Sequence, residues 1–150
     1  MRIIKFRGKT PDGIWVYGQY AGEFDNSNVG GFRGALILAP YATIVEPLTV
    51  GQFTVVTDKN GKEIWEDDVV RVGILSPNYT GSFPEPYYVD TICIYKEGAF
   101  LYKRISPFDK KKLSRNWTYK PMHRYEIYST EVIGNIHDNP ELLKGGIERL

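Results

Sequence analysis

Short runs of alternating apolar and polar residues recur along the whole chain, and they limit what it can fold into. The first two, residues 3–7 and 14–20, flank an Asp12-Gly13 turn and predict a β-hairpin. Successive side chains of a strand point to opposite faces, so this alternation is typical of strands with one buried face. No run with helical periodicity exceeds about three turns. We therefore expect a mainly β protein with a minor α content.

Further strands are expected at residues 35–38, 42–45, 50–56, 62–65, 69–74, 89–96, 99–104, 125–128 and 131–136. Residues 22–34 are rich in Gly, Asn and Ser and predict a loop. Asn139-Pro140 predicts the start of a short helical turn. We expect one domain over residues 1–150: an N-terminal β-hairpin region (1–49), a small SH3-like barrel packed beside it (50–136), and a C-terminal tail (137–150).

The chain's charge and its one cysteine set the expected surroundings. Its 150 residues carry a formal net charge of +1, and Cys93 is the only cysteine. A lone cysteine cannot form an internal disulfide, which favours a reducing compartment. The charged start is not that of a signal peptide, and the longest mostly apolar stretch, residues 35–45, is too short to span a bilayer. We expect a cytoplasmic protein with no membrane partner.

An acidic motif lies in the middle of the sequence, and we interpret it as structural. Asp58, Asn60 and Gly61 predict a tight turn, and Glu66 and Asp68 belong to an acidic corner before the strand at 69–74. At such a corner the Asp68 carboxylate is expected to accept backbone N–H groups. The alternative is a Ca²⁺ or Mg²⁺ site, but the third acidic position and the bidentate Glu of a calcium loop are missing.

Other chemical motifs are incomplete. The Gly-rich segment 30–34 lacks the Gly-Lys-Ser/Thr and the helix that a phosphate-binding loop needs. His123, His137 and Cys93 are too few for a four-ligand zinc site. Cys93 lies between Ile92 and Ile94 in an expected buried strand, where a thiol behaves as a small hydrophobe. We expect no cofactor, no metal and no enzymatic activity.

Three segments at the start, middle and end carry a family resemblance. They are residues 2–7, residues 49–54 together with 58–70, and residues 132–143, the last reading Val-Ile-Gly-Asn-Ile-His-Asp-Asn-Pro-Glu-Leu-Leu. Together they resemble the YopX proteins of phages and prophages. The resemblance implies a phage-derived, mainly β protein of unassigned role, with homo-oligomers in the family. Asp67 stands where that family usually has Gly, and Asp tolerates the left-handed backbone region better than most residues.

Residues 102–125 form a basic segment with a net charge of +7. Its aromatic residues include Trp117 and Tyr119, and stacking rings among cations are what single-stranded nucleic acid requires. Docking on an acidic face of a neighbouring subunit and a plain solvated loop with an edge strand remain alternatives. The basic residues are Lys103, Arg104, Lys110, Lys111, Lys112, Arg115, Lys120 and Arg124.

These observations predict a non-catalytic, oligomeric phage or prophage accessory protein that binds a macromolecular partner in the bacterial host. The alternative function is a single-stranded nucleic-acid-binding module that uses the basic segment.

Overall fold

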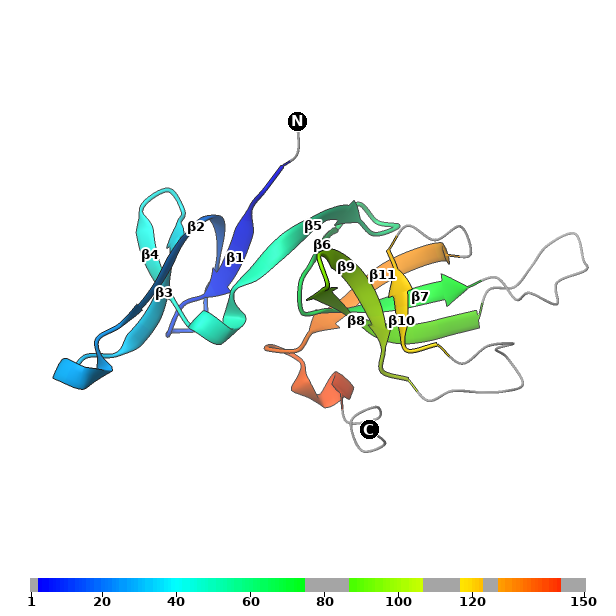
Figure 1. Ribbon diagram of the computed structural model, residues 1–150. Coiled ribbons are helices and arrows are strands. Elements are labelled where there is room, and N and C mark those ends of the chain that lie inside the picture. Colours follow the sequence, from blue (N-terminus) through cyan, green and yellow to red (C-terminus); the bar gives the residue numbers. More distant parts are fainter. Residues whose placement is uncertain (1–2, 75–86, 107–116, 123–126, 144–150) are drawn as a thin grey trace, which may run out of the picture. The chain divides into compact units, whose positions relative to one another are not determined.

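The computed structural model describes residues 3–74, 87–106, 117–122 and 127–143 (Figure 1). The chain divides into two compact units between Val55 and Val56, here called unit 1 and unit 2. Both are built from antiparallel sheets, so the expected mainly β fold is confirmed. The division into regions 1–49, 50–136 and 137–150 stays a prediction.

Unit 1 contains β4, β3, β2, β1 and most of β5, in that order within a six-stranded sheet whose last strand is β6. The β1–β2 hairpin forms as predicted, with Gly13 at a φ of 89° in its turn. The elements are β1 (Phe6–Lys9), β2 (Trp15–Asp25), β3 (Arg33–Leu38), β4 (Ala42–Val45), β5 (Gly51–Thr57) and the 3₁₀ turns η1 (Ser27–Val29) and η2 (Pro47–Thr49).

The core of unit 1 lies on one face of this sheet. Ala35, Ile37 and Val45 are buried there, and the partly buried Phe6 packs against them. Gly8 makes the close packing on Val45 feasible, because a Cβ at residue 8 would lie 2.7 Å from a methyl group of Val45. Val45 can therefore pack closely against β1 only because residue 8 has no side chain.

The region expected to be a loop, residues 22–34, is shorter in the structure. Strand β2 continues to Asp25 and β3 begins at Arg33. The pairing register shifts between Tyr20 and Glu23, and Gly22 lies between them with a φ of 106°. A glycine in this conformation makes a bulge, after which the strand resumes, so the Gly-rich composition did not end the strand.

Unit 2 contains the second sheet, with the order β10-β9-β8-β7-β11. Its core residues include Val70, Val72, Val89, Cys93 and Tyr102, which the strand register places on one face. An SH3-like barrel stays a prediction, since β10 and β11 are the outer strands of the described sheet. The elements are β6 (Glu63–Trp65), β7 (Asp68–Ile74), β8 (Tyr87–Lys96), β9 (Ala99–Arg104), β10 (Tyr119–Pro121), β11 (Ile127–Asn135) and the 3₁₀ turn η3 (Pro140–Leu143).

Two strands of unit 2 differ from the sequence prediction. β10 was not predicted, because it has three residues and ends in Pro121, a residue confined to sheet edges. β11 is one bulged strand from Ile127, where two short strands were predicted; residues 125 and 126 lie outside the described part. Among the described residues no helix has the length and hydropathy needed to cross a membrane.

Candidate functional site

The basic segment begins in β9 and includes β10. Lys103 and Arg104 end β9, Trp117 precedes β10, and Tyr119 and Lys120 belong to it. The structure thus brings together five of the ten residues predicted to make contacts. The other five, and the neighbouring His123, lie outside the described residues; they are Lys110, Lys111, Lys112, Arg115 and Arg124.

On one face of β9–β10, two lysines lie beside a tyrosine. The register places Tyr119 opposite Lys103, so both side chains point to the same face. Lys96, at the end of β8, holds its Nζ 4.3 Å from the centre of the Tyr119 ring. Lys96 was missed at the sequence level, although the predicted hairpin across Glu97-Gly98 already placed it beside the start of the following strand.

On the opposite face, two cations lie over a tryptophan. The Trp117 ring centre is 5.8 Å from Cζ of Arg104 and 5.2 Å from Nζ of Lys120. Trp117 also packs against the core of unit 2, and burial lowers the pKa of the Arg104 guanidinium. The buried Nε1 of Trp117 has no hydrogen-bond acceptor among the described residues. Each face of β9–β10 therefore carries cations stacked on an aromatic ring.

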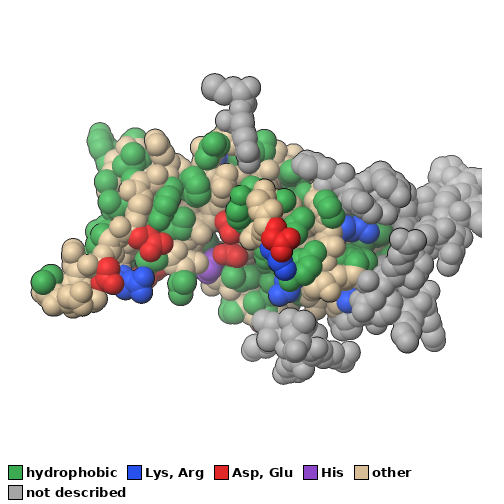
Figure 2. Space-filling model, in the orientation of Figure 1, with side chains coloured by type: hydrophobic (Ala, Val, Ile, Leu, Met, Phe, Trp, Pro, Cys, Tyr) green, Lys and Arg blue, Asp and Glu red, His purple; other side chains and the backbone are tan. Residues whose placement is uncertain are grey.

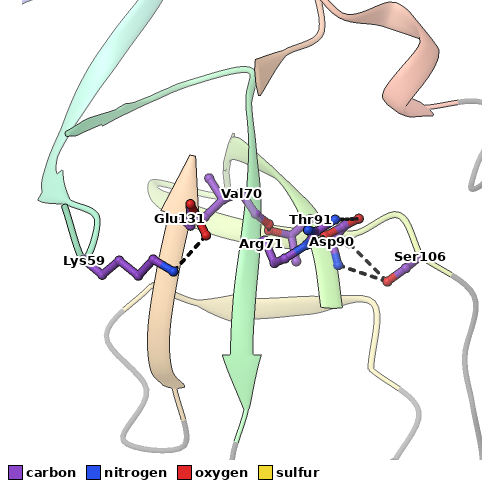
Figure 3. Close-up of polar contacts among 7 residues, drawn as sticks. All are labelled: Lys59, Val70, Arg71, Asp90, Thr91, Ser106 and Glu131. Atoms are coloured by element: carbon purple, nitrogen blue, oxygen red, sulfur yellow. Dashed lines mark hydrogen bonds and ion pairs between the residues drawn. The ribbon is translucent and has the colours of Figure 1, made fainter. Parts of the chain in front are cut away.

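Asp90 on β8 fixes the point where the basic segment leaves β9 (Figure 3). Its carbonyl oxygen accepts the N–H groups of Ile105, at 2.9 Å, and Ser106, at 3.2 Å. Its own N–H donates to Oγ of Ser106 at 3.1 Å. Arg71 donates to both carboxylate oxygens of Asp90, at 2.8 and 3.2 Å, and this hydrogen bonding raises the pKa of Arg71. The carboxylate of Asp90 is thus already paired with Arg71.

The same ion pair belongs to a row of alternating charges across β11, β7 and β8 (Figure 3). Lys59 Nζ lies 2.8 Å from Glu131, and Glu131 is the register partner of Arg71. The side chains of both ion pairs are 31–46% exposed, so each pair contributes only about 0–1 kcal/mol of stability. Together they occupy the carboxylates of Glu131 and Asp90.

The turn at residues 58–61 is held by the carboxylate of Asp58. One oxygen accepts the N–H groups of Asn60 and Lys62, at 2.8 and 2.9 Å, and the other accepts that of Val132 at 3.0 Å. Burial alone would raise the pKa of Asp58, but the three backbone donors outweigh it and the pKa lies below its ordinary value. Gly61 completes the turn with a φ of 79°. The carboxylate that would begin a calcium loop is therefore occupied by backbone donors.

The acidic corner uses the Asp68 carboxylate in the same way. Asp68 is buried, and its Oδ2 accepts the N–H of Trp65 at 2.8 Å, while Glu66 is partly buried beside it. Asp67 has a φ of 70°, and its carbonyl accepts the N–H of Ile136 at 3.1 Å. The corner thus contacts the C-terminal segment, so two of the three segments that carry the family resemblance meet in unit 2.

A network of asparagines that the sequence reasoning missed shapes that C-terminal segment. Oδ1 of Asn135 accepts the N–H groups of His137 and Asp138, at 3.0 and 2.9 Å. The side-chain oxygen of Asn139 in turn accepts the N–H of Asn135 at 3.3 Å. The spacing of Asn and Asp over residues 135–139 was the available signal, because these side chains commonly bond backbone groups two to four residues away.

A groove of about 300 Å³ opens in unit 2 beside the Asp58 turn. Burial raises the pKa of the Tyr102 phenol in its wall, and the side chain of Thr130 acts in the opposite direction. Within the described ranges, no three His, Cys, Asp or Glu side chains gather as a metal site would require. The groove is lined by Val56, Thr57, Asp58, Lys59, Tyr102, Met122, Ile127, Ser129 and Thr130.

Comparison with known proteins gives a family match. The family model described as YopX protein matches residues 5–144. No curated protein matches the chain. Among solved structures, the crystal structure of protein EF1440 from Enterococcus faecalis is similar over 95% of this chain and 99% of that chain, with 22% sequence identity and a TM-score of 0.49.

Proposed function

The chain belongs to the YopX family, and from that premise we propose that it is a non-catalytic accessory protein of phage or prophage origin. It binds an anionic macromolecular partner in the cytoplasm of the bacterial host. The contact surface is the basic edge, which we define as Lys96, Lys103, Arg104, Trp117, Tyr119 and Lys120. The observation that carries this proposal is the placement of cations over aromatic rings on both faces of β9–β10.

Local charge supports an anionic partner. In the described part of the chain no carboxylate forms an ion pair with Lys96 or Lys103. Asp90, the acid that alternation along β8 places on the same face as Lys96, is held by Arg71. Within the described residues, the positive charges of Lys96 and Lys103 are therefore not neutralised by a paired carboxylate.

Two kinds of partner fit such an edge. Single-stranded nucleic acid combines a charged backbone with bases that stack on aromatic rings, and Trp117 and Tyr119 offer rings beside cations. An acidic face of a neighbouring subunit is the other fit, because the chain outside residues 102–125 carries a net charge of −6. The aromatic rings favour nucleic acid as the partner to test first.

The test is fluorescence anisotropy with a labelled single-stranded oligonucleotide at about physiological ionic strength, where the Debye length is only about 8 Å. We expect micromolar or tighter binding that is lost in Trp117→Ala and weakened in Lys103→Gln. Each phosphate contact removed should reduce the steepness of the plot of log K, the binding constant, against log[salt] by roughly 0.7. Lys59→Gln is the matched control, since it removes a lysine paired with Glu131 elsewhere in unit 2.

The outcomes separate the two partners. Absence of binding, with a changed oligomer mass in Lys103→Gln, assigns the basic edge to subunit contact. If neither nucleic-acid binding nor mass responds to changes at the edge, the proposed function is wrong.

We also propose that the protein is a homo-oligomer. Free strand edges favour association, and both β4 and β10 are outer strands of their described sheets. Light scattering behind a sizing column should give a mass well above 17.2 kDa. A monomer at micromolar concentration contradicts this proposal.

A further inference from the structure

Strand β4 exposes one row of backbone hydrogen-bonding groups. Among the described strands it pairs with β3 alone, with Thr43 opposite Ile37 and Val45 opposite Ala35. The Ala39 N–H donates to the Tyr41 carbonyl at 3.0 Å, so residues 39 and 41 form a hydrogen-bonded pair. Every second pair along β3 and β4 is then hydrogen-bonded as well. By the alternation of antiparallel pairs, Thr43 and Val45 bond toward β3. The N–H and C=O groups of Ala42 and Ile44 therefore point away from the sheet.

This edge lacks the features that normally prevent strand pairing. Native edge strands carry charges, prolines or bulges, whereas residues 34–45 contain no charged residue and their one proline, Pro40, lies in the turn before β4. Tyr41 in that turn is 83% exposed, and Leu38 and Ile44 are exposed beside it. In Figure 2, hydrophobic side chains gather at the upper left, where Figure 1 places β3 and β4.

An apolar strip continues inward from the edge on the face opposite the unit 1 core. Gly34 leaves room there for neighbouring side chains, because a Cβ at residue 34 would lie 2.6 Å from Phe24 and 3.3 Å from Ile44. Phe24 in turn contacts the exposed Phe32 edge to face, at 5.5 Å between ring centres. An open hydrogen-bonding edge and an uncharged apolar strip thus lie side by side.

We infer that a second copy of this chain covers this edge, with β4 pairing antiparallel to β4 of its partner. Only an extended strand satisfies the open groups of Ala42 and Ile44, and only an uncharged surface suits the strip. A second copy brings both. Two-fold symmetry sets Ala42 opposite Ile44 of the partner subunit and Thr43 opposite Thr43 of the partner subunit. This inference rests on the proposed homo-oligomer and names its interface.

The register is tested by cross-linking. Residues that face each other across a non-hydrogen-bonded antiparallel pair have Cα atoms about 4.5 Å apart, within the range a disulfide requires. Thr43→Cys should therefore give a disulfide-linked dimer on mild oxidation, seen on a non-reducing gel. The unchanged protein should give none, since Cys93 is buried. Thr118→Cys, an exposed position before β10, is the control for random collision.

The apolar strip is tested by adding a charge. Ile44→Lys should reduce the mass in solution to that of a 17.2 kDa monomer, because it places a charge on the paired edge, one residue from the two-fold axis at Thr43. Leu48→Lys adds the same charge to unit 1 at a residue that is 89% exposed, and it should leave the mass unchanged. Circular dichroism shows whether both variants keep their strands.

An oligomer that persists in Ile44→Lys and gives no cross-link at residue 43 overturns this interface and leaves the homo-oligomer proposal standing. A monomeric unchanged protein overturns both. Neither result bears on the basic edge, whose nucleic-acid binding is measured separately.

Discussion

Nε2 of His137 lies 3.1 Å from Oδ2 of Asp67, and this contact joins two residues that are 70 positions apart in the sequence. Both side chains are partly buried. Asp67 also donates its N–H to the carbonyl of Cys93, at 2.9 Å. One residue in a left-handed turn therefore holds the corner before β7 to both β8 and the turn after β11.

The first prediction separates the two roles of Asp67. Asp67→Ala and Asp67→Gly both remove the contact with His137, but only glycine adopts a φ of 70° without strain. We expect the alanine variant to be less stable than the glycine variant by about 1 kcal/mol, measured by urea unfolding. Equal stabilities would mean that residue 67 does not hold a left-handed backbone in solution.

The second prediction concerns Asp68. Asp68→Ala leaves the buried N–H of Trp65 without its acceptor, so the free energy of unfolding should fall by about 1–3 kcal/mol. Asp12→Ala, at an exposed carboxylate in the first hairpin turn, should change it little. Calorimetry tests the structural role independently: micromolar Ca²⁺ or Mg²⁺ affinity that disappears in Asp68→Ala would identify a metal site instead.

The third prediction is a pH dependence at Asp58. Its pKa is lower in the folded protein than its ordinary value, because three backbone N–H donors outweigh the effect of burial. The ionised carboxylate therefore stabilises the fold at pH values above its unfolded pKa of about 3.9, and this contribution is lost as the pH falls through the lower, folded value.

Asp58→Asn should accordingly cost stability near neutral pH, and the difference from the unchanged protein should shrink below about pH 4. Urea unfolding across a pH series measures it. Asp12→Asn, at an exposed carboxylate in the first hairpin turn, is measured beside it as the control for the substitution itself. A difference that stays constant down to acid pH contradicts the assigned role of the Asp58 carboxylate.

The fourth prediction concerns Gly134 in β11. A Cβ there would lie 2.5 Å from Oδ1 of Asn139 and 2.9 Å from a methyl group of Leu142. Gly134→Ala should lower the free energy of unfolding by about 1–3 kcal/mol through overpacking. The cost should be smaller when the oxygen is removed first by Asn139→Ala. An undiminished cost in that background would show that Asn139 is not the obstacle.

Local patterns predicted many of the strands with close boundaries. Residues 35–38 and 42–45 were expected as strands interrupted at Pro40, and β3 and β4 are found there. The patterns failed where pairing overrides composition. β2 passes through Gly22 because a bulge lets the strand continue, and β10 exists because β9 provides three register partners for it.

Part of the candidate site was predictable and part was not. The charge and aromatic content of residues 102–125 pointed to Arg104, Trp117 and Lys120, and the structure brings these together. Lys96 joined them only through the β8–β9 hairpin and the pairing of β10 with β9. A count of charges over residues 102–125 does not include Lys96, because Lys96 belongs to the neighbouring strand β8.

The sequence by itself determined the mainly β character, the turn residues and the acidic corner, because each depends on residues within a few positions of one another. Only the tertiary structure decided the order β10-β9-β8-β7-β11, the contact of Asp67 with His137, and the uncharged edge of β4 as an outer strand. Alternation indicates that a segment is a strand and which of its faces is buried, but not which strands pair with it. That choice depends on register and packing over the whole sheet.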